Sequence, residues 1–185
     1  MFARVFKLKS PLGSFARARD GATAVEFAMI APVFFLLIVG MAEVTLMGFA
    51  QSSLDFAVGE TARRIRTGEV QAEGLSQGEL RDDMCGTLNW LINVSCEGTL
   101  HLDVDRYASF VDVRNNSPMA GGGFNEGEID FNPGGPSDIV MVRAYMQWPM
   151  ITPLFEQFFA NMSDGTRILS STLLFRNEPF PDPNP

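Results

Sequence analysis

One apolar segment constrains this chain more than any other feature of the sequence. Residues 22–48 are almost entirely apolar, and the 16 residues from Phe27 to Ala42 carry no charge. As a helix that rises about 1.5 Å per residue, residues 22–47 would cover roughly 39 Å, enough to cross the hydrocarbon core of a bilayer with some tilt. We therefore expect a transmembrane helix over residues 22–48, surrounded by membrane lipid.

The two sides of this segment carry opposite charge. Residues 1–21 contain five Lys or Arg and one Asp, for a net charge of +4, whereas the remainder contains nine basic and 21 acidic side chains, for −12. A basic flank beside a hydrophobic span tends to stay in the cytoplasm. We therefore expect residues 1–21 to be a cytoplasmic basic leader and residues 49–185 to be an extracytoplasmic head.

The acidic head argues against nucleic acid as a partner, because phosphate contacts need clustered Lys and Arg. The one tight basic cluster consists of Arg63, Arg64 and Arg66. We interpret it as the polar face of a helix, with docking to an acidic partner as the alternative.

The cysteines and the single histidine limit the kinds of chemistry that the head could carry out. Cys85 and Cys96 are the only cysteines, and the topology places them in an oxidising compartment, so we expect a disulfide between them. His101 is the only histidine, and we expect no metal site and no cofactor. The sequence has no nucleophile elbow, no Walker loop and no Cys-x-x-Cys pair, so we expect no enzymatic activity.

Glu26 is the unusual residue of the apolar segment. An ionised carboxylate at the edge of a bilayer costs about 2 to 3 kcal/mol and often marks a function, although a simple interfacial carboxylate is the alternative. If the chain is cut after Gly21, Ala22 acquires a free ammonium one helical turn from Glu26, and the two charges could neutralise one another. An ordinary signal peptide would instead be cut at the far end of its apolar core.

The run Gly21-Ala-Thr-Ala-Val-Glu26-Phe27 resembles the cleavage motif of type IV prepilins. The longer run from Arg17 to Glu43 resembles the start of TadE-like pseudopilins of the tight adherence (Tad, or Flp pilus) machinery. The chain length, the cysteine pair and the ending Ser-Ser-Thr-Leu-Leu-Phe-Arg-Asn-Glu-Pro-Phe180 are also similar to that family.

The resemblance implies that a prepilin peptidase cuts between Gly21 and Ala22, with Glu26 and Phe27 as the acidic and aromatic pair of the motif. It further implies a minor pseudopilin that is required for assembly of an adhesive pilus and acts in surface attachment and biofilm formation. The implied location is the bacterial inner membrane, with the N-terminus in the cytoplasm and the head in the periplasm; after processing the protein could be pilus-associated or extracellular. The implied partners are the prepilin peptidase, other pilus-assembly proteins and pilin subunits.

The alternative is an uncleaved single-pass membrane protein with an external binding or scaffold head in a secretion complex. It would share the span, the orientation and the disulfide, and the Gly21–Phe27 pattern would then be a coincidence. Processing of the N-terminus separates the two.

Helical patterns follow the span. Gly68 is expected to end the first helix at about Thr67. The apolar residues at near-helical spacing that continue this helix are Phe49, Leu54, Val58, Ala62 and Ile65. Ser76-Gln-Gly-Glu79 is a capping-box pattern that predicts the start of a second helix. The apolar residues of that second helix are Leu80, Met84, Leu88, Leu91 and Ile92.

Alternating patterns predict three strands in the rest of the head. The first is Leu100 to Val104, continued through Phe110 and Val113, and the others are Ile139 to Trp148 and Arg167 to Phe175. On the polar face of the first strand lie His101, Asp103 and Asp105, and we expect His101 to be a surface or partly covered side chain rather than a catalytic base. The predicted fold is α+β, with a long N-terminal helix, transmembrane and then amphipathic, packed on a small antiparallel sheet with a second helix.

Two further segments have open interpretations. Residues 115–136 are rich in Gly and Pro and predict a long exposed loop, in which Glu126, Glu128 and Asp130 lack the spacing of an EF-hand, so we expect partner contact rather than calcium binding. Leu154 to Asn161 predicts a short helix whose Phe155, Phe158 and Phe159 could belong to the core or contact lipid or a neighbour.

Overall fold

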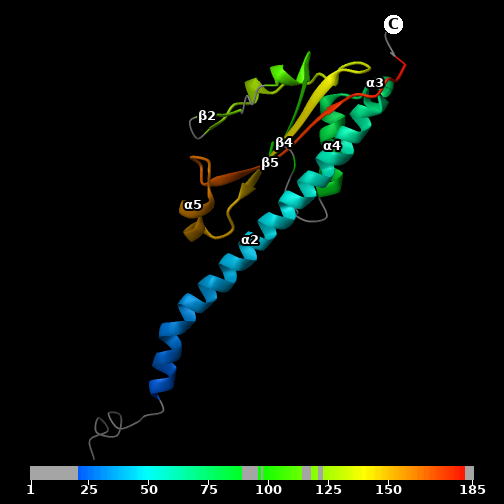
Figure 1. Ribbon diagram of the computed structural model, residues 1–185. Coiled ribbons are helices and arrows are strands. Elements are labelled where there is room, and N and C mark those ends of the chain that lie inside the picture. The colour runs from blue at the N-terminus through cyan, green and yellow to red at the C-terminus, as the bar shows by residue number, and fades with distance from the viewer. Residues whose placement is uncertain (1–20, 89–95, 97, 114–117, 121–122, 182–185) are drawn as a thin grey trace, which may run out of the picture. The chain divides into compact units, whose positions relative to one another are not determined.

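The computed structural model of this chain describes residues 21–88, 96, 98–113, 118–120 and 123–181 (Figure 1). The described residues fall into two compact units, which divide between Met41 and Ala42. Helix α2, Ala22–Arg66, runs through 45 residues, as the sequence predicts, and contributes its first 20 residues to the first unit. Gly68 follows it with a φ of 82°, a left-handed conformation that glycine adopts without strain.

The second unit contains a three-stranded antiparallel sheet in the order β1-β4-β5. The strands are β1 (Leu100–Tyr107), β4 (Ile139–Pro149) and β5 (Thr166–Arg176), so the three predicted strands are confirmed. β4 lies in the centre, with Leu100 opposite Met146 on one side and Pro149 opposite Thr166 on the other. Together with the helices, this sheet makes the unit α+β, as predicted.

The core lies between the sheet and one face of α2. From residue 47 onward the buried apolar residues of α2 recur every three or four positions: Met47, Ala50, Leu54, Ala57, Val58, Ala62 and Ile65. The same cluster includes residues of all three strands, for example Leu102, Val142 and Leu169. Phe49 was expected on this face but is 56% exposed, because Met47 and Ala50 occupy the inner positions at that turn.

Helix α4, Gln77–Leu88, begins with the predicted capping box. The Ser76 amide donates to the Glu79 carboxylate at 2.8 Å, and the Glu79 amide donates to the Ser76 hydroxyl at 3.3 Å. The buried face of α4 consists of Leu80, Met84 and Leu88, whereas the predicted Leu91 and Ile92 lie outside the described residues. A short helix that the sequence did not predict, α3 (Glu69–Glu73), connects α2 to α4.

The expected disulfide joins Cys85 on α4 to Cys96, with Cα atoms 5.8 Å apart. It ties the helix to the chain just before β1, across a segment that is only partly described. Cys85 and Cys96 also pack against the core, so the bridge constrains the chain and fills space.

The face of β1 opposite α2 differs from the prediction. Asp103 was expected on a polar surface but is fully buried, because the segment around Asp130 covers it. The Asp130 amide donates to Asp103 at 3.0 Å, and the guanidinium of Arg143 on β4 lies 2.6 Å from both Asp103 and Asp105. Burial raises the pKa of Asp103, although the Asp130 amide and Arg143 offset part of this effect.

The end of β1 and the segment after it also differ from a simple strand and loop. β1 ends at Tyr107, and the predicted continuation through Phe110 and Val113 is wrong, because Phe110–Asp112 forms the 3-10 helix η2 with its N-terminus capped by Ser109. Within the predicted loop 115–136 the structure has two short strands, β2 (Met119–Ala120) and β3 (Gly123–Phe124), and the 3-10 helix η3 (Glu126–Glu128). Residues 130–132 pair with the free edge of β1 through hydrogen bonds to Val104.

The buried ion pair gives a testable expectation for stability. Arg143→Met leaves the buried Asp103 carboxylate without its cation, so we expect the free energy of unfolding to fall by about 3 kcal/mol or more. Arg106→Met is the matched control, since Arg106 lies on the same sheet with an exposed side chain that pairs with the partly buried Asp138, and this change should lose less than about 1 kcal/mol.

The measurement is urea unfolding of the full chain in detergent, followed by circular dichroism at several pH values. A buried carboxyl with a raised pKa favours the folded state when it is protonated, so the loss caused by Arg143→Met should shrink as the pH is lowered through the folded-state pKa of Asp103. Equal losses for Arg143→Met and Arg106→Met would contradict the importance of the buried pair.

Candidate processing site and membrane helix

The four residues of the predicted processing site lie at the start of α2. Gly21 is exposed and directly precedes the helix, Ala22 is its first residue, and Glu26 and Phe27 are both exposed. The first turn of α2 contains no acidic residue. Ala22 and Glu26 are four positions apart in a continuous helix, and the structure therefore places them on the same face, one turn from each other.

The surroundings of Gly21 do not require a glycine. A Cβ atom added at this position would meet no other described atom within 4 Å. Its φ angle does not lie in the left-handed region either, unlike that of Gly68 or Gly74. A side chain at position 21 is therefore compatible with the described fold, and packing gives no reason for the glycine.

The first unit exposes an apolar helix. Between Ala22 and Met41 every residue is exposed except Ala31 and Gly40, which are partly covered. Large side chains such as Phe27, Met29 and Met41 have 67%, 75% and 72% of their surface exposed. In water this exposure would be strongly unfavourable, at about 25 cal/mol for each Å² of apolar surface.

α2 is long and apolar enough to cross a membrane, and none of its most apolar window is buried. The helix contains Pro32, which removes one backbone hydrogen-bond donor and frees a carbonyl one turn earlier. Membrane helices tolerate such prolines where neighbouring groups satisfy the freed carbonyl. The described part of the chain has one helix of this kind.

Glu43 is a polar residue of α2, and the sequence did not indicate which group it would contact. Only 1% of its surface is exposed, and its Oε1 atom accepts a hydrogen bond from the Ile151 amide at 2.8 Å and a longer one from the Thr152 amide at 3.5 Å. The available signal was its position as the first charged residue after the charge-free run. The partner, more than 100 residues further along the chain, could not be identified from spacing.

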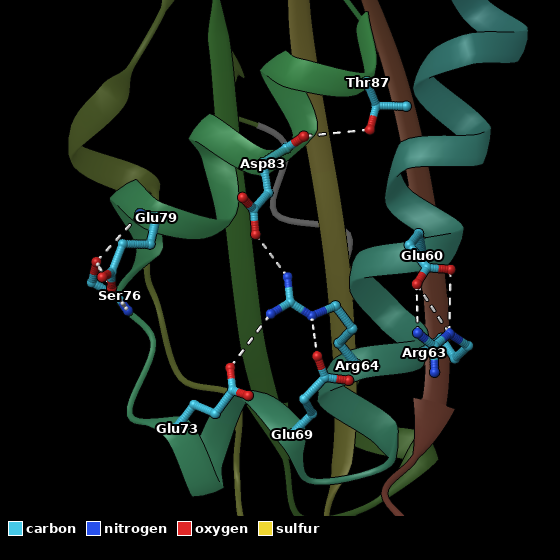
Figure 2. A network of polar contacts seen from close by, with 9 residues as sticks. All are labelled: Glu60, Arg63, Arg64, Glu69, Glu73, Ser76, Glu79, Asp83 and Thr87. Carbon is cyan, nitrogen blue, oxygen red and sulfur yellow. Dashed lines mark hydrogen bonds and ion pairs between the residues drawn. The ribbon is translucent and has the colours of Figure 1, made fainter.

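The basic cluster of Arg63, Arg64 and Arg66 is paired within the head, and Figure 2 shows the partners of Arg63 and Arg64. Arg64 lies 2.7 Å from Glu69, 2.8 Å from Asp83 and 3.7 Å from Glu73, and it joins the end of α2 to α3 and α4. Arg63 pairs with Glu60, and Arg66 lies 3.5 Å from Glu178. These contacts support the interpretation of the cluster as a polar helix face rather than a docking site for an acidic partner.

His101 is partly covered, with 11% of its side chain exposed, within the range that the sequence predicted. Its ring stacks on Phe124 with ring centres 4.5 Å apart, and Nδ1 lies 3.8 Å from a Glu126 carboxylate oxygen. Burial lowers the pKa of His101, and the nearby Glu126 offsets this only in part. Within the described residues no group of three or more His, Cys, Asp and Glu side chains is placed to hold a metal ion.

The lowered pKa of His101 predicts a specific pH dependence. Between the folded-state pKa and the ordinary value of about 6.5 the unfolded chain binds more protons, so stability should fall as the pH drops through this window, by at most about 1.4 kcal/mol per pH unit. His101→Gln should remove this component and leave the contribution of the carboxylates.

The free energy of unfolding is measured from pH 7.5 to 5 for the unchanged protein and for His101→Gln. The difference between the two gives the contribution of the histidine to the pH dependence of stability. Because the chain has one histidine, its NMR titration reports the folded-state pKa directly. A titration at or above pH 6.5, or equal slopes for both proteins, would contradict the expected effect of burial.

Comparison with known proteins gives a match to a protein family over part of the chain. The model of the family described as TadE-like protein matches residues 21–63, a segment that begins at Gly21 and covers most of α2. No curated protein and no solved structure matches significantly. The resemblance of the N-terminal segment to TadE-like proteins of the Tad pilus system is therefore confirmed for these residues.

Proposed function

We propose that this chain is a TadE-like minor pseudopilin, processed by a prepilin peptidase between Gly21 and Ala22, which is required for assembly of a Tad adhesive pilus. At the level of the family, the match over residues 21–63 supports a minor pseudopilin associated with the Tad pilus. Peptidase processing and the roles in surface attachment and biofilm formation are the finer parts of the proposal.

The observation that carries the processing step is the coincidence of three features at Gly21 and Ala22. The family match begins at Gly21, α2 begins at Ala22, and Gly21 has no packing or backbone requirement for glycine among the described residues. A glycine that the fold does not need, next to the first residue of the helix, fits recognition by another protein. A prepilin peptidase would read it as the residue before the scissile bond.

Hydrolysis of this bond has a physical consequence for the helix. Addition of water turns the Gly21 carbonyl into a carboxylate on the released leader and gives Ala22 a free ammonium. That cation would lie at the positive end of the helix dipole, where it is unfavourable. Glu26 lies one turn away on the same face, and its carboxylate would neutralise the ammonium within one subunit or between neighbours.

The proposal also assigns location and partners. The leader of net charge +4 would hold the N-terminus in the cytoplasm, α2 would cross the inner membrane, and the head of residues 49–185 would lie in the periplasm. The partners would be the peptidase, pilus-assembly proteins and pilin subunits. The chain would act through contacts and not as an enzyme, with neither cofactor nor nucleic acid involved.

The processing step is tested by the mass and N-terminal sequence of the protein in membranes with and without a prepilin peptidase. We expect a chain that starts at Ala22 in the first case and at Met1 in the second. Gly21→Val should remain uncut. Gly48→Val is the matched control, because Gly48 also lies in open space but far from the bond, and it should be cut normally. An uncut chain in both membranes would favour the uncleaved anchored protein with an external binding head.

The role of Glu26 is tested after processing. Glu26→Gln keeps the shape of the side chain but leaves the Ala22 ammonium without a counter-charge, so we expect a chain that is cut but whose pili fall in number by on the order of tenfold, equivalent to about 1.4 kcal/mol. Glu60→Gln, an exposed acid of the same helix, should leave the pili unchanged. The measurement is the count of surface pili in cells that carry each variant as the only copy. An unchanged count for Glu26→Gln would favour the simple interfacial carboxylate.

A further inference from the structure

The segment from Met150 to Phe159, here called the foot, exposes large apolar side chains. It follows β4 and contains the short helix α5, Pro153–Phe159. Ile151, Leu154 and Phe158 have 62%, 48% and 69% of their surface exposed. Phe155 and Phe159 are partly buried, and Phe159 packs against the core.

The two faces of α5 therefore have different surroundings but the same apolar character. Leu154 and Phe158 are four positions apart and share the outer face, while Phe155 and Phe159 share the inner one. The inner face explains how the segment attaches to the head. The outer face has no equivalent explanation within the second unit.

The foot lies at the end of the second unit where α2 enters it. Glu43, the second residue of this unit, accepts hydrogen bonds from the amides of Ile151 and Thr152. β4 reaches the foot through Pro149, which pairs with Thr166 at the start of β5. At the other end of the sheet Tyr107 pairs with Ile139, and the exposed η2 follows it.

This position is adjacent to the apolar run along the chain. Glu43 is the first charge after the 16 charge-free residues that end at Ala42. If that run crosses a bilayer, chain connectivity brings Glu43 to the lipid boundary. The hydrogen bond from Ile151 then brings the foot to the same boundary.

The charge pattern of the head supports lipid as the occupant. The head, residues 49–185, carries nine basic and 19 acidic side chains, for a net charge of −10 that would repel an anionic membrane surface, yet the 20 residues from Ala144 to Ser163 contain one charged side chain, Glu156. The foot itself thus carries one charged side chain, Glu156, and Arg167 on β5 donates to its Phe159 carbonyl at 2.8 Å.

The backbone of the foot also suits a lipid boundary. Amides that leave water need an internal acceptor, since an unsatisfied donor in an apolar setting costs several kcal/mol. Glu43 supplies that acceptor for Ile151, while Thr152 accepts from the Phe155 amide and Glu156 from the Ala160 amide, each at 2.9 Å. The exposed apolar side chains are therefore carried by a segment with several amides already satisfied.

We propose that Ile151, Leu154 and Phe158 insert into the leaflet that faces the head, so that the foot rests in the same bilayer that α2 spans. This inference rests on the membrane anchoring in the proposed function. The partner is lipid, and a second copy of this chain or another protein at the same face is an outcome that the test distinguishes.

The test uses nitroxide labels on the full-length chain, with one copy per nanodisc of phosphatidylethanolamine and phosphatidylglycerol. Both native cysteines are in the disulfide, so a single introduced cysteine takes the label. The labelled variants are Phe158→Cys in the foot, Leu37→Cys in the span and Val111→Cys as control. Val111 is apolar and 92% exposed, but it lies in η2 at the other end of the sheet.

The depth of each label follows from its accessibility to oxygen, which concentrates in lipid, and to a water-soluble nickel chelate. We expect the labels at positions 158 and 37 to meet oxygen and be shielded from nickel, and the label at position 111 to show the reverse. A second comparison places the label at Leu154→Cys, with and without Phe158→Ser. The substitution should lower the ratio of molecules with the foot in lipid to molecules with the foot in water by on the order of tenfold, because it removes the burial of one aromatic side chain. Phe158 is largely exposed, so this change leaves the core intact.

The contrary outcomes are distinct. If the foot label behaves like the label at position 111 while the label at position 37 remains in lipid, lipid insertion of the foot is contradicted. The membrane anchoring of α2 would be unaffected by that result. A label at position 37 that is accessible to the nickel chelate would contradict the membrane anchoring of α2, and with it the insertion of the foot. A foot label shielded from both reagents, with spin–spin broadening that grows as more copies share a disc, identifies a protein contact and overturns lipid insertion.

Discussion

One helix has to suit two environments within 45 residues, and the remaining structure depends on how α2 meets this constraint. Up to Met41 its side chains are almost all apolar and exposed, with no buried face. From Glu43 onward it buries one stripe, from Met47 to Ile65, against the sheet. A helix in lipid needs no distinct face, whereas a helix in water is stable only if its apolar stripe is covered. The sheet and α4 provide that cover.

Features that depend on local sequence were predictable, and features that depend on distant partners were not. The capping box of Ser76 and Glu79, the end of α2 just before Gly68 and the central strand β4 follow from turn chemistry and periodicity. Asp103 follows the same alternation, yet it is buried because the segment around Asp130 covers it and Arg143 pairs with it across the sheet. The alternation of apolar and polar residues along a strand cannot by itself show that both faces of the strand are covered.

The candidate site shows the same division. Gly21, Ala22, Glu26 and Phe27 form a local motif, and their placement at the start of α2 required only the onset of the apolar run. Glu43 carries a signal of similar strength as the charge that ends the run, but its role depends on the Ile151 amide. The sequence could therefore indicate that Glu43 marks a boundary, while only the structure could indicate what the carboxylate holds there.

The two acids that bracket the charge-free run explain how the register of α2 in a bilayer could be set. Apolar side chains continue past Glu43, with Val44, Leu46 and Phe49 all exposed, so hydrophobic matching alone leaves the helix free to slide. Glu26 and Glu43 are 17 positions apart, about 26 Å along a helix, close to the thickness of a hydrocarbon core. Moving Glu43 into lipid would bury its charge more deeply or break its bond to Ile151. If α2 spans a bilayer, the head would therefore resist that displacement, and the position of the helix in the bilayer would be coupled to the fold of the head.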